Sequence, residues 1–131
     1  MSSKVEWFTP AGTMAPVGPY SHIAKVGQFI TIGGTAGVDP ATGDLVGPDL
    51  ASQTRQILEA FEIMLATIGS SLDYVIYINI FLADMQDVDR MNDAYVEKMG
   101  KRRPARTAIA VSGLPKPGAL LTMNLTAVTK E

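Results

Sequence analysis

The residues that could carry out chemistry in this chain are few, and the most informative one is an arginine. Arg106 stands in the run Arg103-Pro104-Ala105-Arg106-Thr107. A guanidinium group offers a planar set of donors that matches a carboxylate, and it stays charged at any relevant pH. Pro104 ends whatever element precedes it, so we expect Arg106 to open a strand and to project from a sheet edge. Residue chemistry alone does not decide between a carboxylate anchor and an ordinary surface ion pair.

Most other catalytic arrangements are missing. The chain has no cysteine and one histidine, His22, so disulfides and a cysteine nucleophile are excluded and a dedicated transition-metal site is not expected. His22 could serve in a Ser-His-Asp triad, but no Gly-x-Ser-x-Gly motif places a serine beside it. A lone histidine is more often a surface or hydrogen-bonded residue. The run Gly33-Gly34-Thr35-Ala36-Gly37 lacks the Lys-Ser/Thr pair of a phosphate-binding loop.

The length of the chain predicts a single domain spanning residues 1–131. The net charge of −2 argues against nucleic acid as a partner. One basic cluster near the second predicted helix fits a solvated helix end: Lys98, Lys101, Arg102 and Arg103. Residues 1–6 lack the apolar region of a signal peptide, and no apolar run approaches the ~20 residues that span a bilayer. We therefore expect a cytoplasmic protein with no membrane partner.

The first half of the chain predicts a hairpin followed by a helix. Residues 21–26 and 28–35 are apolar runs separated by Gly27, and residues 39–44 form a turn-rich loop. Asp49 is a plausible N-cap for the helix, and Gly69 is placed to end it. The apolar residues between them recur at helical spacing on one face: Leu50, Ile57, Phe61, Met64, Leu65 and Ile68.

The second half predicts three strands and a shorter helix. Residues 74–83 alternate and are rich in β-branched types, as expected of a strand with a buried face. Asp87 or Asp89 should cap the helix, whose apolar residues are Met91, Tyr95, Val96 and Met99. Residues 107–111 and 120–128 are the last strands. The predicted order is β-β-(β)-α-β-α-β-β, an α+β fold. Two helices cannot cover both faces of such a sheet, which predicts an oligomer packed through the open face.

Several motifs in register resemble the Rid family of reactive-intermediate (enamine/imine) deaminases, some of whose members are labelled endoribonucleases or translation inhibitors. The resemblance runs from about residue 13 to residue 128. Its matching segments are Gly18-Pro19-Tyr20-Ser21, Gln53-Thr54, Gly69-Ser70-Ser71-Leu72-Asp73, Phe81-Leu82-Ala83-Asp84-Met85, Asn92, Arg103-Pro104-Ala105-Arg106-Thr107 and Leu114-Pro115-Lys116.

The resemblance implies a chorismate-mutase-like α+β fold with a mixed sheet of five or six strands and two helices on one face. It also implies a homotrimer with clefts between subunits and hydrolysis of 2-imino acids to 2-keto acids and ammonia without metal or cofactor. In such a site Arg106 would hold the substrate carboxylate and Tyr20 would donate its hydroxyl. Asn92 would lie near the cleft, or else be an ordinary polar residue on a helix face. Backbone groups from Gly33 to Ala36, Thr35 among them, would complete the pocket.

This chain departs from the family pattern on the side of the site that handles water. Thr122 replaces a glutamate that is the usual candidate for activating the hydrolytic water, and a hydroxyl can orient water but cannot act as a carboxylate base. Gly33 replaces a serine or threonine, Thr35 a glutamine, and His22 a residue that is often glutamine. We therefore place Arg106 and Thr122 as catalytic candidates and Tyr20, Gly33, Thr35 and Asn92 as substrate-binding candidates.

The predicted function is hydrolytic deamination of small 2-imino or enamine acids, with the carboxylate on Arg106 at a subunit interface. One alternative is a deaminase of a larger enamine acid such as 2-aminomuconate. Another is a non-catalytic trimer that binds small carboxylates. Ribonuclease activity has little support, because the pI is about 5.3 and the chain contains one histidine and few aromatic residues.

Overall fold

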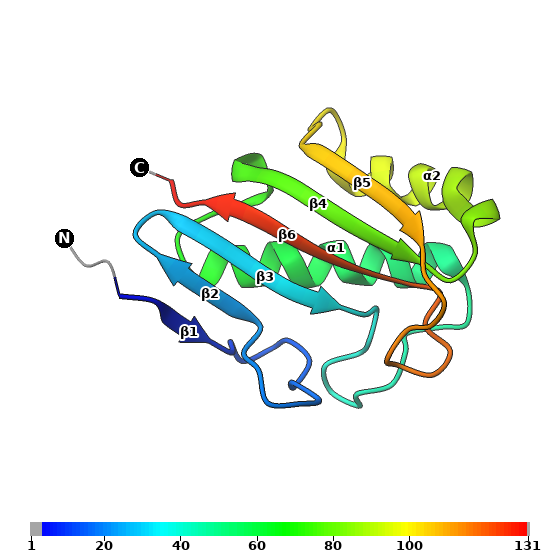
Figure 1. The fold of residues 1–131 in the computed structure, drawn as a ribbon, viewed down its shortest axis with the longest axis horizontal. Coiled ribbons are helices and arrows are strands. Elements are labelled where there is room, and N and C mark those ends of the chain that lie inside the picture. Colours follow the sequence, from blue (N-terminus) through cyan, green and yellow to red (C-terminus); the bar gives the residue numbers. More distant parts are fainter. Residues whose placement is uncertain (1–3, 131) are drawn as a thin grey trace.

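The computed structural model describes residues 4–130 as a six-stranded sheet flanked by two helices (Figure 1). Residues 1–3, part of the N-terminal segment considered above for a signal peptide, lie outside the described residues, as does residue 131. The strands lie in the order β1-β2-β3-β6-β4-β5. Their bounds are β1 Glu6–Phe8, β2 Ile23–Val26, β3 Phe29–Thr35, β4 Val75–Leu82, β5 Ala105–Ala110 and β6 Leu121–Val128.

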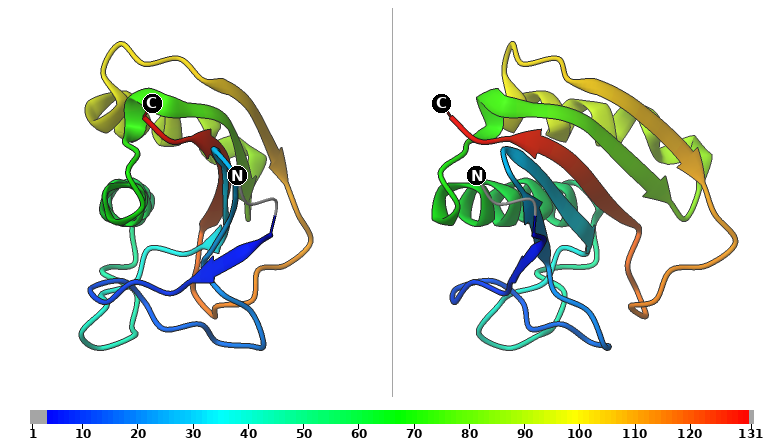
Figure 2. Two further views of the ribbon diagram at one scale, coloured as in Figure 1. Left: turned by 90° about the vertical axis from the view of Figure 1, so that its left-hand side faces the viewer. Right: turned by 60° about the vertical axis from the view of Figure 1, so that its left-hand side comes forward.

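The sheet is mixed, and both helices lie on the same face of it. Neighbouring strands are antiparallel except β4 and β5, which are parallel and joined through helix α2 (Val88–Met99). Helix α1 (Leu50–Thr67) lies beside α2, and Figure 2 shows both on one side of the sheet with the opposite side open. The predicted α+β class and the uncovered face are thus confirmed. Within residues 4–130, neither helix is long and apolar enough to cross a membrane.

Helix α1 has the bounds that its capping residues predict. The Asp49 carboxylate accepts a hydrogen bond from the backbone N–H of Ser52 at 2.9 Å, which satisfies one of the free donors of the first turn. At the other end Gly69 has a φ of 77°, and the N–H of Ser70 donates to the Leu65 carbonyl at 2.9 Å. This is the left-handed ending that glycine adopts without a Cβ penalty.

Helix α2 begins where predicted but is capped differently. Asp87 precedes it without a capping hydrogen bond from its side chain. Asp84 instead caps a preceding 3-10 turn (Met85–Asp87), accepting from the N–H of Gln86 at 2.9 Å. Val96, which the sequence placed on the apolar face, is 46% exposed. It lies next to Tyr95 in sequence, and a helical step of about 100° turns it away from the core.

Two strand assignments need correction. Strand β5 begins at Ala105, two residues before the predicted start, because the extended backbone after Pro104 pairs with β4 at once. Strand β1 was not predicted. It is a three-residue edge strand whose partner among the described strands is β2, and it has no fully buried residue, so it lacks an alternating apolar signal. The hairpin of β2 and β3 turns at Gly27, whose φ is 59°, as predicted.

A buried glutamine fixes the loops at one end of the sheet. Gln53 of α1 is fully buried, and its amide N–H₂ donates to the carbonyls of Gly47 at 3.0 Å and Gly118 at 3.3 Å. Its side-chain oxygen accepts from the N–H of Leu120 at 2.8 Å. Gly37 packs against the Gln53 backbone so closely that a Cβ there would lie 2.6 Å from the Gln53 carbonyl oxygen. The Gln53 side chain thus ties two loops to α1, and its backbone packs against a third segment.

Candidate functional site

A cavity of about 290 Å³ opens at the end of the sheet where β3 finishes and β6 begins. Its lining is largely apolar, with the Tyr20 and Thr122 hydroxyls among its few polar groups and no carboxylate among the residues that line it. The lining residues are Met14, Val17, Tyr20, Gly34, Ala36, Pro115, Lys116, Pro117 and Thr122. One loop that Gln53 anchors carries Pro115, Lys116 and Pro117 and forms part of the cavity wall, so α1 helps to position the cavity through the hydrogen bonds of Gln53.

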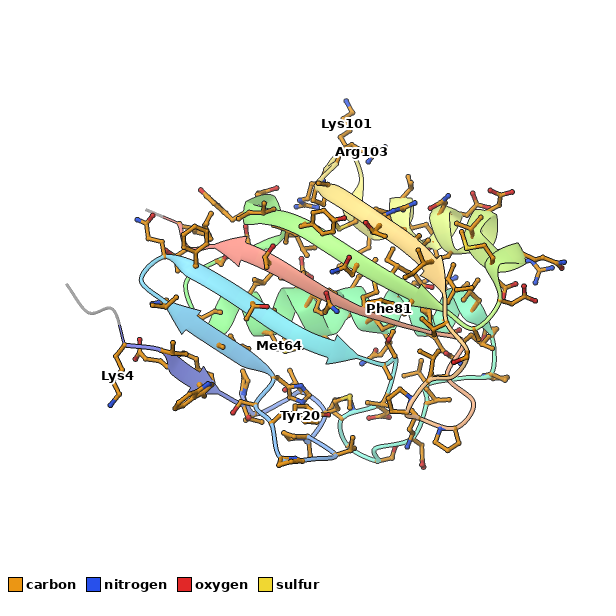
Figure 3. The ribbon with its side chains drawn as sticks, in the orientation of Figure 1. Lys4, Tyr20, Met64, Phe81, Lys101 and Arg103 are labelled. Atoms are coloured by element: carbon orange, nitrogen blue, oxygen red, sulfur yellow. The ribbon has the colours of Figure 1, made fainter. Side chains whose placement is uncertain are left out.

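Tyr20 lies at the cavity and is 42% exposed, beside the loops that connect the strands (Figure 3). Its hydroxyl accepts a hydrogen bond from the Val17 N–H at 3.2 Å, which leaves the hydroxyl hydrogen free to donate. The ring meets the His22 imidazole edge to face, with centroids 5.9 Å apart. Tyr20 can therefore present a donor to a polar group inside the cavity.

His22 lies behind the cavity wall and not in its lining. The imidazole is 1% exposed, and its Nε2 is hydrogen-bonded to the Met14 carbonyl oxygen. Because a carbonyl only accepts, Nε2 carries the proton, and Nδ1 is then a buried acceptor that has no partner within residues 4–130. Of the two ordinary interpretations of a lone histidine, the structure supports the hydrogen-bonded one. Through Met14 and Tyr20, His22 contacts two residues of the cavity.

A bulge in β3 decides which residues of the Gly33–Ala36 run face the cavity. Ile32 pairs with Leu125 and Thr35 with Met123, so two glycines stand opposite one residue of β6. This extra residue is the defining feature of a β-bulge. Gly34 and Ala36 line the cavity as a result. The Gly-Gly pair inside a strand was a signal for such a bulge.

Gly33 and Thr35 are placed differently from Gly34. Gly33 donates its N–H to the His22 carbonyl at 2.9 Å and is next to the lining without being part of it. The Thr35 side chain is buried on the helix side of the sheet, and its hydroxyl donates to the Gly33 carbonyl at 2.9 Å. It faces a separate cavity of about 30 Å³ against α1. Neither Gly33 nor Thr35 places a side chain in the cavity that Tyr20 and Thr122 line.

Thr122 reaches the cavity from the open face of the sheet. It pairs with Phe81 of β4 and alternates with Leu121 and Met123, which are fully buried on the helix side. Half-buried in this position, its hydroxyl is one of the few polar groups that line the cavity. The structure therefore brings together Tyr20, Thr122 and the backbone of the glycine pair.

Arg106 lies elsewhere in the same chain. It pairs with the buried Ile78 of β4, and its guanidinium carbon lies over the ring of Tyr95 of α2, 5.0 Å from the ring centroid. Among residues 4–130 no carboxylate is within 4 Å of its guanidinium group. Figure 3 shows Arg103, close by in sequence, at the edge of the molecule farthest from Tyr20. A surface ion pair within the chain does not account for Arg106.

Helix α2 supplies the surroundings of Arg106. Tyr95 is 4% exposed, and burial raises its pKa above the usual value near 10, while the positive charges of Arg106 and Arg103 oppose that rise. The phenol is therefore neutral at physiological pH. Asn92 lies one helical turn before Tyr95, and its side-chain oxygen is buried without a hydrogen-bond partner in the part of the chain that the structure describes. Arg106 and Tyr95, with Asn92 one turn away, form a second group, which no hydrogen bond within residues 4–130 joins to Tyr20 or Thr122.

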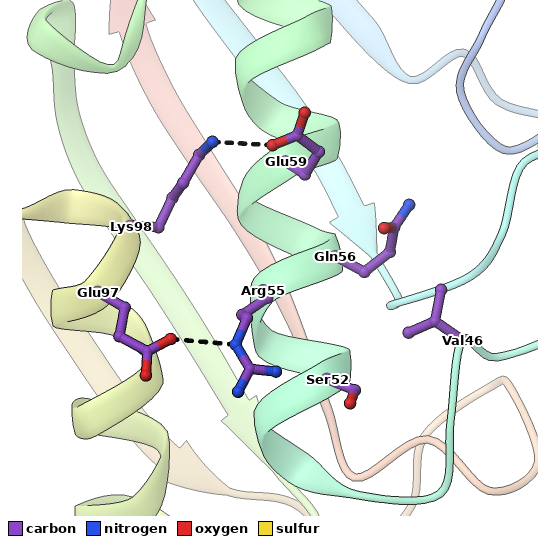
Figure 4. Close-up of a pocket in the computed structure, with 7 residues that line it drawn as sticks. All are labelled: Val46, Ser52, Arg55, Gln56, Glu59, Glu97 and Lys98. Carbon is purple, nitrogen blue, oxygen red and sulfur yellow. Dashed lines mark hydrogen bonds and ion pairs between the residues drawn. The ribbon is translucent and has the colours of Figure 1, made fainter.

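A cavity of about 520 Å³ is a different feature, an open groove between α1 and α2 (Figure 4). Its charges pair with one another. Arg55 Nε is 3.0 Å from Glu97 Oε2, and Lys98 Nζ is 2.8 Å from Glu59 and 2.7 Å from Glu62. The hydrogen bonds that Lys98 donates to these two glutamates raise the pKa of its ammonium group. With its cations already paired, the groove offers little charge to a ligand. Within residues 4–130, no group of three or more His, Cys, Asp or Glu side chains could hold a metal ion.

The family model described as endoribonuclease L-PSP matches residues 11–129 of the chain. A RutC family protein of Pyrococcus horikoshii is 46% identical over 101 residues, which is 77% of this chain and 80% of the relative. A 2-iminobutanoate/2-iminopropanoate deaminase of Bos taurus is 36% identical over 119 residues (90% and 87%). A 3-aminoacrylate deaminase of Acinetobacter baylyi is 35% identical over 116 residues (88% and 91%).

Solved structures show the same fold. The yeast protein YEO7 superposes with a TM-score of 0.91 and 30% identity, covering 97% of this chain and 100% of its own. RidA from an Antarctic Psychrobacter superposes with a TM-score of 0.88 and 30% identity, covering 94% and 98%. The architecture is therefore shared by proteins that carry the Rid name.

Proposed function

This chain belongs to the Rid family, whose model is described as endoribonuclease L-PSP, and from that premise we propose that it hydrolyses small 2-imino or enamine acids to 2-keto acids and ammonia. The named deaminases among its relatives support Rid-type deamination. One observation of this structure carries the proposal: Arg106 is half-buried and has no carboxylate partner among residues 4–130. Such a cation is free to receive a carboxylate from a ligand.

The reaction needs little from the protein beyond binding and orientation. Arg106 holds the substrate carboxylate with two parallel hydrogen bonds, which fixes the adjacent imine carbon. Water adds to that carbon to give an amino alcohol. The carbon–nitrogen bond then breaks, ammonia leaves, and the remaining hydroxyl becomes the keto oxygen. The Tyr20 and Thr122 hydroxyls orient the water and donate to the nitrogen or oxygen as charge develops. An enamine enters the same sequence after tautomerising to the imine.

We further propose that the site is completed by a second copy of the chain. Arg106 with Tyr95 and Asn92 lies toward the β5 edge, whereas Tyr20 and Thr122 share a cavity at the end of β3 and β6. β6 and β5 are two strand spacings apart, roughly 10 Å, and Thr122 and Arg106 face opposite sides of the sheet. Packing the open faces of three copies together would bring the Arg106 edge of one chain to the Tyr20–Thr122 cavity of the next. A homotrimer with three interfacial sites is the assembly that we propose.

The cavity also admits a larger substrate. Its volume of about 290 Å³ and mostly apolar lining leave room beyond a four-carbon imino acid, so a longer enamine acid such as 2-aminomuconate is the second candidate. Either substrate needs a carboxylate anchor. We expect no RNA cleavage, because the only histidine is buried and the net charge is −2.

The test is deamination of 2-iminobutanoate generated in situ from threonine by a dehydratase, with the free imine trapped chemically. We expect the wild type to accelerate imine loss and Arg106→Ala to lower kcat/KM by about 10²-fold. Arg55→Ala is the matched control, since it removes an arginine from the outer groove between the helices. No acceleration by the wild type, or full activity in Arg106→Ala, would contradict the proposal. Turnover of 2-aminomuconate alone would favour the second candidate.

A further inference from the structure

Tyr95 is a core residue of α2 that meets the proposed anchor directly. The side chain is 4% exposed and packs in the main hydrophobic cluster with Met91, Met99 and Ile78. One face of its ring is covered by the Arg106 guanidinium, whose central carbon lies 5.0 Å from the ring centroid. A cation within about 6 Å of an aromatic face is attracted by the negative charge density of that face. The ring is held by the core, so it offers Arg106 a fixed platform.

The position over the ring suits an arginine that must bind a carboxylate. A guanidinium has five N–H donors in one plane, and contact with a ring through its carbon does not use them all. The donors that point away from the ring stay available for a two-point contact with a ligand. An arginine side chain also has several rotatable bonds, and ordering them on binding would weaken affinity. A side chain already ordered against Tyr95 avoids most of that loss.

The groups that act on Tyr95 do not neutralise the charge of the guanidinium. The phenol is neutral because burial raises its pKa, so it does not form an ion pair with Arg106. The other charged group acting on it is Arg103, a second cation whose guanidinium donates to the carbonyls of Gly100 at 2.6 Å and Arg102 at 2.8 Å. The ring therefore attracts the cation without neutralising it.

We propose that Tyr95 is the positioning residue of the site: its ring holds Arg106 in the orientation that receives the substrate carboxylate. This inference rests on the proposed function, because it assigns Tyr95 a role through the anchor. Tyr95 itself need not touch the substrate. We assign the role to the aromatic face, over which the guanidinium carbon lies, and not to the hydroxyl, whose side-chain hydrogen bond with Arg106 also lowers the pKa of Tyr95.

The test compares Tyr95→Leu, which removes the aromatic face, with Tyr95→Phe, which keeps it. We expect Tyr95→Leu to raise KM for 2-iminobutanoate about 3- to 30-fold, the range of a partly buried cation–π contact, with kcat changed far less. Tyr95→Phe should restore KM to within about twofold of the wild type, on the same contact energies. Met91→Ala is the matched control, because Met91 is a fully buried residue on the same helix face. It should lower stability and leave KM unchanged.

A second readout is independent of turnover. Protons of the Arg106 side chain that lie over an aromatic ring shift upfield in the NMR spectrum. This shift should be present in the wild type and in Tyr95→Phe and lost in Tyr95→Leu. If the wild type shows no ring-current shift, or if Tyr95→Leu keeps the wild-type KM, the inference is overturned even when deamination is confirmed.

The two proposals can fail separately. If the wild type does not deaminate imines, the proposed function fails, and binding of 2-ketobutanoate by calorimetry then decides the role of Tyr95. Weaker binding to Tyr95→Leu than to the wild type and Tyr95→Phe supports the positioning role in a carboxylate-binding protein. Equal affinity in all three proteins, or no binding to any of them, overturns it.

Discussion

Thr122 is the residue that most distinguishes this site from one with a carboxylate base. Its hydroxyl lines the cavity together with that of Tyr20, and none of the lining residues has a carboxylate. A hydroxyl can orient a water molecule, but near neutral pH it does not take a proton from it. The proposed reaction then relies on the positioning of water and substrate. A general base would increase the rate at which the water attacks the imine carbon.

We expect Thr122→Glu to raise kcat for 2-iminobutanoate by about 10²-fold, the lower end of what a positioned general base contributes. Thr122→Gln is the control, because glutamine has the shape of glutamate without its basicity. Steady-state rates as a function of pH would show the new base, because kcat should increase as the pH rises and the glutamate loses its proton. An equal effect of both variants would mean that side-chain size, and not proton transfer, controls the water.

At the residue scale, sequence reasoning could name candidate site residues but not the tertiary contacts around them. Arg106, Tyr20 and Thr122 are recognisable by type and motif, and the structure places the last two in one cavity. The contact of Arg106 with Tyr95 was not predicted, because helical spacing marks Tyr95 only as a core residue and a tertiary contact has no local signal. Gly34, in turn, faces the cavity because a bulge shifts the alternation of β3.

At the scale of elements, the ends of α1 were predictable and the cavity wall was not. Asp49 caps the helix through a nearby backbone N–H, and Gly69 ends it through its own left-handed conformation. Both effects are local, so the sequence predicts them. The hydrogen bonds of Gln53 to Gly47 and Gly118 join segments up to 65 residues apart and depend on the packed fold. Edge strand β1 was not predicted for a similar reason, because the feature that defines it is its pairing with β2 and not a local sequence pattern.

We expect Gly37→Ala to destabilise the protein by about 1–3 kcal/mol, as overpacking typically does. A Cβ at this position would lie 2.6 Å and 2.7 Å from backbone atoms of Gln53, which cannot move without shifting α1. Gly113→Ala is the control, because an added Cβ there meets no atom within 4 Å and its φ is not left-handed. Urea unfolding of the two variants would show the difference, and equal stabilities would contradict this account of the packing.

At the scale of the whole molecule, the open sheet face is the surface on which the proposed contact between copies of the chain would form. It carries Phe81 and Ile109 alongside polar pairs such as Asn79 with Asn124, whose side chains are hydrogen-bonded at 3.0 Å. A mixed face of this kind suits contact with a second copy better than contact with lipid or water alone. The helices cover the other face. A lysine introduced on the open face should therefore affect assembly differently from a lysine introduced on the helical side.

We expect Ile109→Lys to break the proposed trimer and to abolish deamination. Val96→Lys should do neither, although Ile109 and Val96 are both 46% exposed. The reason is their location, since Ile109 pairs with Phe81 on the open face and Val96 lies on α2. Sedimentation should give about 42 kDa for the wild type and Val96→Lys and the 14.0 kDa of a single chain for Ile109→Lys. A 14.0 kDa wild type would remove the basis for interfacial sites.

The distance between Arg106 and the Tyr20–Thr122 cavity has a consequence for how the activity responds to protein abundance. On the proposed assembly, a chain on its own is folded but holds only halves of two different sites. Activity per chain would therefore depend on the concentration of the protein. Dilution would abolish the activity by separating the chains, without unfolding them. A chain lacking Arg106 and a chain lacking the cavity residues could also complement each other when expressed together. Each would supply, in some of the mixed assemblies, the half that the other lacks.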